Sequence, residues 1–211
     1  MKKMMLTVAL FVATFSAVEA QKINLGKAVS AASKGAQALA FSNEDAKKLS
    51  KESVEWMDKH NPVTDSKSAY TKRLNRLFGK HKSEDGLDLN YKVYHVVDIN
   101  AFACADGSVR VFSSLMDLMT DDELLAIIGH EIGHVKNEDT KDAIKSAYLR
   151  AAAQDAAGAA SGVVRALSDS ELGEMANAML DAKHSKKQES QADEYAYNFM
   201  KKHGYNVVAV Y

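Results

Sequence analysis

The first half of the chain alternates polar-rich helical patterns with turn signals. Residues 22–60 have the spacing of helices, and Ser42-Asn43-Glu44-Asp45 predicts a helix start within them. Asn61-Pro62 indicates a turn, because the residue before a proline avoids helical geometry. A basic helix is predicted over 65–80, ending near a glycine, and residues 83–86 are expected to form a loop.

The pattern then changes to the two-residue period of a strand. Residues 91–98 show the alternation expected of a strand: one set of positions holds Tyr91, Val93, His95 and Val97, and the other holds Lys92, Tyr94 and Val96. Residues 100–113 predict two short strands around Ala105-Asp106-Gly107-Ser108, since Asp-Gly favours a tight hairpin turn. No other part of the sequence indicates β structure with comparable clarity.

From there the chain is predicted to be helical almost to its end. Thr120-Asp121-Asp122-Glu123 matches a capping box, with Thr120 as the N-cap. Residues 141–166 are alanine-rich but interrupted by charges, which favours a packed helix or helical hairpin and excludes a membrane span. A charged connector at 183–187 leads to a last helix, for which His203-Gly204 would form the C-terminal end. We therefore expect an α+β fold, mainly helical, with a small sheet or hairpin before the helix that follows Thr120.

The first twenty residues have the composition of a secretory signal peptide. Lys2 and Lys3 precede an apolar segment, and Val18-Glu19-Ala20 forms a small-residue cleavage site, so cleavage is expected after Ala20. The alternative is an uncleaved anchor, but fifteen apolar residues (4–18) are short for a membrane span of about 20. We expect an exported protein with a single domain over residues 21–211 and no transmembrane span in the mature chain.

Composition narrows the classes of partner. The chain has 211 residues, a formal net charge of -1 and 26% charged residues, so nothing favours nucleic acid or an anionic membrane surface. Its single cysteine, Cys104, excludes an internal disulfide, and a small buried strand residue is the expected role for it. The sequence indicates no particular oligomeric state.

Candidate chemistry lies in IIGHEIGHVK, residues 127–136. At 100° per residue, His130 and His134 lie about 40° apart on one face of a helix, with Glu131 beside them. Gly129 and Gly133 form a neighbouring strip that would let another helix approach closely. The opposite face is apolar and is predicted to pack on the core through five residues, Leu124, Leu125, Ile128, Ile132 and Val135.

The spacing of these polar residues fits metal-assisted hydrolysis. Two imidazoles at i and i+4 can bind one tetrahedral ion, while the intervening glutamate is placed to take a proton from a metal-bound water. The alternative is an ordinary helix with three polar surface residues. Against it, two mid-helix glycines cost about 1 kcal/mol each relative to alanine and therefore require a packing reason.

A third ligand is expected from the last helix. Glu189 and Asp193 lie at i and i+4 there, on or near the face that carries Ala192, Ala196 and other apolar residues. A carboxylate pair directed inward is costly unless it coordinates a metal or pairs with a polar group. An exposed acidic helix start, favoured by the helix dipole, is the alternative.

Together these motifs resemble the gluzincin zinc metallopeptidases. HEIGH at 130–134 and E-x-x-x-D at 189–193 are similar to those of the HtpX and CAAX-prenyl-protease family, and within it to the exported bacterial YggG/LoiP-like branch. The resemblance spans roughly 90–206, with further matching stretches at 100–117 and 129–139. It implies a zincin-like fold in the periplasm and zinc-dependent cleavage of peptide bonds in unfolded or damaged envelope proteins.

The resemblance also implies roles for individual residues. One zinc ion per chain would be held by His130, His134 and Glu189, with Glu131 as the general base. Asp193 would not bind the zinc itself but would accept a hydrogen bond from a ligand histidine and so orient its ring. The strand segment that borders the cleft would bind an extended substrate; its residues are Asn100, Ala101, Phe102 and Ala103.

The chain departs from this family in one respect that affects catalysis. Members continue beyond the glutamate helix to a His-Pro segment and an arginine that stabilises the transition state, whereas this sequence ends at Tyr211. Candidates for that role within the chain are His95, Tyr148, His184 and His203. Two other functions remain open: a non-catalytic zinc-binding chaperone or assembly factor that uses the same cleft, and an aminopeptidase.

Overall fold

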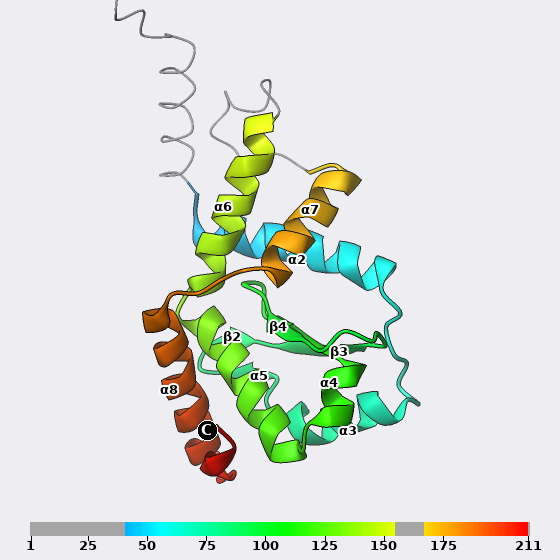
Figure 1. Cartoon of the computed structure of the whole chain (residues 1–211), viewed down its shortest axis with the longest axis vertical. Coiled ribbons are helices and arrows are strands. Elements are labelled where there is room, and N and C mark those ends of the chain that lie inside the picture. Colours follow the sequence, from blue (N-terminus) through cyan, green and yellow to red (C-terminus); the bar gives the residue numbers. More distant parts are fainter. Residues whose placement is uncertain (1–40, 155–166, 211) are drawn as a thin grey trace, which may run out of the picture.

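A small sheet lies between two groups of helices. The computed structural model describes residues 41–154 and 167–210 and has the expected α+β fold, mainly helical with short strands. The proposed signal peptide, the first part of the 22–60 region and the end of the alanine-rich segment lie outside the described residues. Figure 1 shows the sheet edge-on, with helices above and below it.

The sheet has three strands in the order β3-β5-β4. β4 (Ala101–Ala103) and β5 (Ser108–Phe112) form the predicted hairpin, and β3 (Asn90–Tyr94) pairs with β5 in parallel. Gly107 has a φ of +85°, and a Cβ there would lie 1.9 Å from the Asp88 carbonyl oxygen, so this turn requires glycine. The order leaves β4 at an edge of the sheet.

Two expectations for the segment before the hairpin are wrong. Residues 83–86 are not a plain loop, because β1 (Ser83–Glu84) pairs with β2 (Leu87–Asp88) in a small antiparallel hairpin. Asp85 and Gly86 both have positive φ, 49° and 85°, which is the geometry of a tight two-residue hairpin turn. The strand predicted over 91–98 ends at Tyr94.

Three helices cover one face of the sheet. α2 (Asn43–His60) starts at the predicted position, where Ser42 and Asp45 form a capping box. α6 (Asp139–Gln154) begins the alanine-rich segment, and α7 (Asp169–Leu180) packs on both α6 and α2. These helices form the upper part of the molecule in Figure 1.

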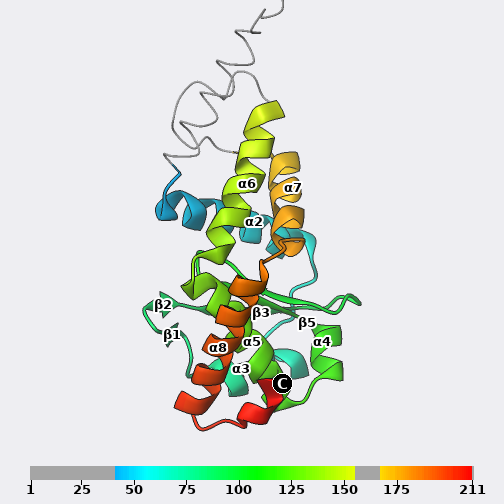
Figure 2. The same ribbon diagram turned by 60° about the vertical axis from the view of Figure 1, so that its left-hand side comes forward.

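The other face carries the helix with the two histidines. α5 (Asp121–Lys136) has the predicted Thr120–Glu123 capping box, and α8 (Lys186–Lys202) lies alongside it in both Figure 1 and Figure 2.

α3 (Ala69–Phe78) ends at Gly79 as expected but begins later than residue 65, because Ser68 is its N-cap. A short helix, α4 (Ser113–Leu118), joins β5 to α5, and a 3-10 turn follows α8 at Val207–Val210.

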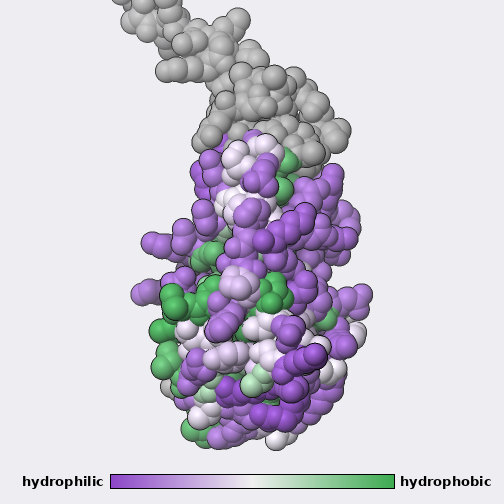
Figure 3. Space-filling view, turned by 90° about the vertical axis from the view of Figure 1, so that its right-hand side faces the viewer, coloured by the Kyte–Doolittle hydropathy of each residue, from purple (hydrophilic) through white to green (hydrophobic). Residues whose placement is uncertain are grey.

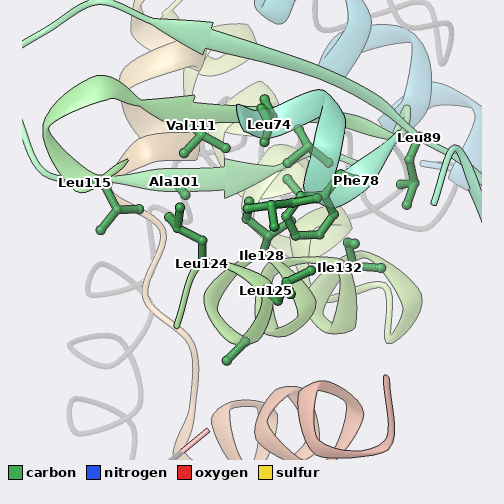
Figure 4. Close-up of a cluster of buried hydrophobic side chains, with 14 of the residues drawn as sticks. Leu74, Phe78, Leu89, Ala101, Val111, Leu115, Leu124, Leu125, Ile128 and Ile132 are labelled. Atoms are coloured by element: carbon green, nitrogen blue, oxygen red, sulfur yellow. The ribbon is translucent and has the colours of Figure 1, made fainter. Parts of the chain in front are cut away.

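The main core lies between the sheet and α5. The predicted apolar face of α5 is buried there, with Ile128 and Ile132 fully inaccessible to solvent. Figure 4 shows these side chains directed toward residues from α3 and the strands, including Phe78 and Val111. Burial of a leucine or isoleucine side chain contributes about 1.5–3 kcal/mol, so this face fixes the rotation of α5 about its axis.

The face of the molecule shown in Figure 3 is mainly polar, with hydrophobic side chains gathered in a band at mid-height. Within residues 41–154 and 167–210, no helix combines the length and apolar character needed to cross a bilayer.

Candidate metal centre

The rotation of α5 places its two histidines together on the face away from the core. His134 is buried and His130 is partly buried, and their Nε2 atoms are 3.0 Å apart. The two rings are nearly perpendicular, with centroids 4.7 Å apart. The i, i+4 spacing therefore brings two imidazole nitrogens to one point, as the sequence predicts.

The glycine strip of α5 allows α8 to pack closely against it. A Cβ on Gly133 would lie 3.1 Å from the Cα of Ala192, and a Cβ on Gly129 would lie 3.5 Å from the Cα of Ala196. Neither backbone could approach as closely if larger residues replaced the glycines. The close contact sets the position of Glu189, which lies in the first turn of α8.

Glu189 faces the two imidazole nitrogens. One carboxylate oxygen lies 3.5 Å from His130 Nε2 and the other lies 3.8 Å from His134 Nε2. One potential ligand atom from each of the three residues falls within 4.8 Å of the others. Two nitrogens and a carboxylate oxygen are the donor set of a catalytic zinc site that keeps a fourth position open.

The outer ring nitrogens each contact a carboxylate. Asp193 Oδ1 lies 2.9 Å from His130 Nδ1, and Asp139 Oδ2 lies 2.9 Å from His134 Nδ1. Because an ionised carboxylate only accepts hydrogen bonds, each Nδ1 carries the proton. With Nδ1 as the only protonated nitrogen of each ring, the two Nε2 lone pairs point at each other across 3.0 Å, an arrangement that a cation between them would stabilise. The residues therefore fit a metal ion.

The two carboxylates differ from expectation in their surroundings. The side chains of Glu189 and Asp193 are 47% and 63% exposed, so they lie at the rim of the centre rather than buried beneath α8. Asp139, which was not predicted from the sequence, is buried, and its other oxygen accepts a hydrogen bond from Gln188 Nε2 at 2.9 Å. An acidic residue five positions after His134, at the start of the next helix, is the signal that could have identified it.

Substitution of Asp193 tests the orienting contact on His130. An Asp193→Asn variant should bind the metal about 10–100-fold more weakly, the usual cost of losing a carboxylate that orients a ligand histidine. His130, His134 and Glu189, the proposed ligands, would all remain, so activity should return at saturating metal. Competition with a chelating dye measures the affinity. Asp142→Asn, on α6, is the control; equal affinities for the two variants would contradict the assignment.

Glu131 lies beside the imidazoles, in a cavity of about 230 Å³. The cavity is walled by the sheet edge and by the α5, α6 and α7 side chains, and its lining includes Asn100, Ala101, Phe102 and Ala103, together with His184. Burial, and after it the negative charge of Glu189, raise the pKa of Glu131 from 4.5 to about 8, while a hydrogen bond from the Ala103 backbone acts in the opposite direction. A cation at the imidazoles would favour the ionised carboxylate.

The raised pKa predicts a pH-dependent stability of the metal-free protein. The folded protein binds a proton at Glu131 more tightly than the unfolded chain does. The contribution of this proton to stability is complete below pH 4.5 and is lost as pH rises through about 8. Relative to Glu131→Gln, metal-free wild type should therefore lose stability between these values, by at most about 5 kcal/mol. Urea unfolding at pH 5 and pH 9 measures the difference, and a difference independent of pH would contradict the prediction.

Of the four residues considered for transition-state stabilisation, His184 is the one that lines the cavity. Its ring stacks on that of His134, with centroids 3.9 Å apart and planes 18° apart. His203 lies in a separate cluster with Glu84, His95 packs against Tyr70, and Tyr148 packs against a phenylalanine, Phe41.

The buried Cys104 also contributes to the cavity wall, and burial raises the pKa of its thiol well above the usual value.

A known peptidase family and two bacterial metalloproteases are similar to this chain. Peptidase family M48 matches residues 71–211, which contain all three potential metal ligands and Glu131. Metalloprotease YcaL of Escherichia coli (strain K12) is 39% identical over 183 residues, covering 86% of this chain and 72% of that protein. Metalloprotease LoiP of the same strain is 37% identical over 205 residues, covering 97% of this chain and 81% of that protein.

A shorter likeness extends to a third group of proteases. Protease HtpX of Actinobacillus pleuropneumoniae serotype 5b (strain L20) is 43% identical over 51 residues, or 22% of this chain and 18% of that protein. The family match covers most of the chain, and two metalloproteases are similar to it over most of their own length. The chain belongs to peptidase family M48, a family of metalloproteases.

Proposed function

We propose that this protein is a zinc-dependent metalloendopeptidase that cleaves unfolded or damaged proteins of the bacterial envelope. The observation that carries the proposal is the convergence, in one cavity, of two imidazole nitrogens, a glutamate carboxylate and a second, partly buried glutamate. His130, His134 and Glu189 would hold one ion. Bound zinc would supply Lewis acidity, polarising the scissile carbonyl and lowering the pKa of water.

Glu131 is proposed to move the protons of the reaction. Its carboxylate accepts a proton from the attacking water and then delivers that proton to the nitrogen of the departing amine. The Ala103 hydrogen bond holds this side chain against the sheet edge, where a substrate carbonyl would also lie. The same side chain therefore acts first as base and then as acid without changing position.

The β4 edge is proposed to bind the substrate backbone. Asn100 and Cys104 direct backbone groups toward β5: the Asn100 carbonyl accepts from Phe112 N–H at 3.0 Å, and Cys104 N–H donates to Ser108 O at 2.9 Å. In an antiparallel pair the intervening odd residues, Ala101 and Ala103, direct their backbone groups to the other side. That side faces the cavity. The Ala103 N–H already donates to Glu131, so the backbone groups of Ala101 and the Ala103 carbonyl are the ones that can pair with an extended peptide. Such pairing does not depend on the side chains of the peptide, which favours unfolded substrates.

The export of the protein is proposed from the sequence alone. The basic, apolar and small-residue regions of residues 1–20 support secretion, and the resemblance of the sequence motifs to an exported bacterial branch of the family favours the periplasm as the compartment. N-terminal sequencing of the mature protein from cell fractions tests this. A chain that starts at Gln21 in the periplasm is expected, and an intact N-terminus in the cytoplasm would contradict it.

The proposed activity is tested with one substrate protein in two states. The zinc-loaded enzyme should cleave a reduced and alkylated protein at internal bonds and leave its native disulfide-bonded form intact, as mass spectrometry of the products would show. Stepwise loss of N-terminal residues would instead identify an aminopeptidase. Stable binding without products would identify a zinc-binding chaperone.

Backbone pairing is tested with N-methylated peptides. Methylation of the substrate amides that pair with β4 should raise KM, whereas methylation of the neighbouring amides, which point away, should have little effect. The second peptide series is the matched control because it removes the same number of N–H groups. Equal effects of both series would contradict pairing with the β4 edge.

A further inference from the structure

A second cluster of metal-binding side chains lies outside the cavity. His81, Glu84 and His203 each offer a ligand atom within 4.8 Å of the others. His81 follows α3, Glu84 ends β1, and His203 is the C-terminal cap of α8. The cluster therefore joins the β1-β2 hairpin to the end of α8 that is remote from Glu189.

The three donor groups meet at one carboxylate oxygen. Glu84 Oε2 lies 3.2 Å from His81 Nδ1 and 3.0 Å from His203 Nε2. A tetrahedral zinc ion with bonds of about 2.0–2.1 Å has ligand atoms about 3.3 Å apart, close to both of these separations. The three ligand atoms all lie within 4.8 Å of one another. His81 and Glu84 are only 1% and 4% exposed, and the rings of Phe78 and Phe199 pack against His81.

The remaining polar atoms of the cluster have partners that are compatible with a bound ion. His81 Nε2 lies 2.8 Å from the Tyr205 hydroxyl, so the ring can donate there while Nδ1 binds a metal. Such a partner on the second ring nitrogen is typical of histidine ligands. Lys202 Nζ contacts the other oxygen of Glu84, Oε1, and leaves Oε2 to the two imidazoles.

We propose that His81, Glu84 and His203 form a second transition-metal site, selective for zinc or a similar divalent ion. Imidazole and carboxylate donors suit such ions, and three protein ligands leave one position for water. Binding would fasten the C-terminal end of α8, the helix whose other end carries Glu189. The site does not depend on the proposed protease function, because it shares no residue with the cavity.

The competing arrangement is a hydrogen-bonded network without an ion. In that network both imidazoles donate N–H groups to Glu84 Oε2, and Tyr205 donates to His81 Nε2. The two arrangements differ in measurable zinc content. They also differ in whether zinc raises the melting temperature once the cavity ligands have been removed.

The experiment uses a full-length His130→Asn, Glu189→Gln variant as the background. This pair removes two cavity ligands and keeps the buried His134–Asp139 contact. After equilibrium dialysis, wild type should hold two zinc ions per chain and the background variant one. Zinc should raise the melting temperature of the background variant, and Co²⁺ should give it the visible absorption of a tetrahedral site.

Adding His203→Gln to the background should abolish the remaining zinc, the thermal shift and the cobalt spectrum. His203 is partly exposed at a helix end, so its replacement should preserve the fold. His60→Gln is the matched control, because His60 also ends a helix but joins no metal-binding group among the described residues. One zinc in wild type, with none and no thermal shift in the background variant, would overturn the proposal.

Discussion

A Glu131→Gln variant should hydrolyse peptides with a kcat about 10²–10⁴-fold below wild type, the usual contribution of a positioned general acid–base group. Glutamine keeps the size of the side chain and its contact with the Ala103 backbone, but it cannot accept and return a proton. Glu131 is not in the proposed ligand set, so zinc content should stay unchanged. Initial rates on an unfolded protein, with zinc measured in the same samples, check both results.

A matched control separates this effect from a general change of charge. Glu194 lies on α8, is exposed and does not line the cavity, so Glu194→Gln should keep wild-type activity. Equal rates for the Glu131 variant and wild type, with zinc bound in both, would contradict the proposed role. Loss of zinc from the Glu131 variant would instead place this residue among the ligands.

Replacement of Glu189 by alanine should remove one zinc equivalent and abolish peptide hydrolysis. The two histidines on α5 would remain, but two imidazoles without a carboxylate do not complete the three-ligand set of a catalytic zinc. Zinc at 100 times its dissociation constant stabilises a protein by about 2.7 kcal/mol. For a chain of this size that corresponds to a fall of about 5–11 °C in Tm when the site is lost.

The control for this prediction is Glu194→Ala, which changes the same helix on its exposed side. Metal analysis and differential scanning calorimetry at a fixed zinc concentration compare the two variants with wild type. Unchanged zinc content and Tm in the Glu189 variant would show that Glu189 does not bind the metal. Wild-type turnover by that variant would lead to the same conclusion.

The parts of the centre that could be predicted depend on local sequence. The Thr120–Glu123 capping box, the apolar face of α5 and the i, i+4 spacing of its histidines are set within one helix. The glycine strip predicted a close neighbour, and both of its residues, Gly129 and Gly133, pack against α8. Periodicity within a single helix is therefore sufficient to orient these side chains.

Features that depend on contacts between distant segments could not be predicted in this way. The parallel pairing of β3 with β5 requires a crossover that no local pattern specifies. Asp139 was missed because its contact with His134 depends on the break between α5 and α6, where Glu138 has a φ of +62°. The Asp85-Gly86 turn was visible in the sequence, but strands of two residues are too short to show periodicity.

The proposed metal centre requires that His130, His134 and Glu189 together bind an ion next to Glu131. Anomalous scattering at the zinc absorption edge, from crystals grown with zinc, locates such an ion. We expect a peak at the α5–α8 contact, about 2.0–2.1 Å from His130 Nε2 and from His134 Nε2, and bonded to a Glu189 oxygen. Glu131 is expected to lie close to the ion without binding it. No peak at this contact, or an ion bound by Glu131 in place of Glu189, would contradict the proposed centre.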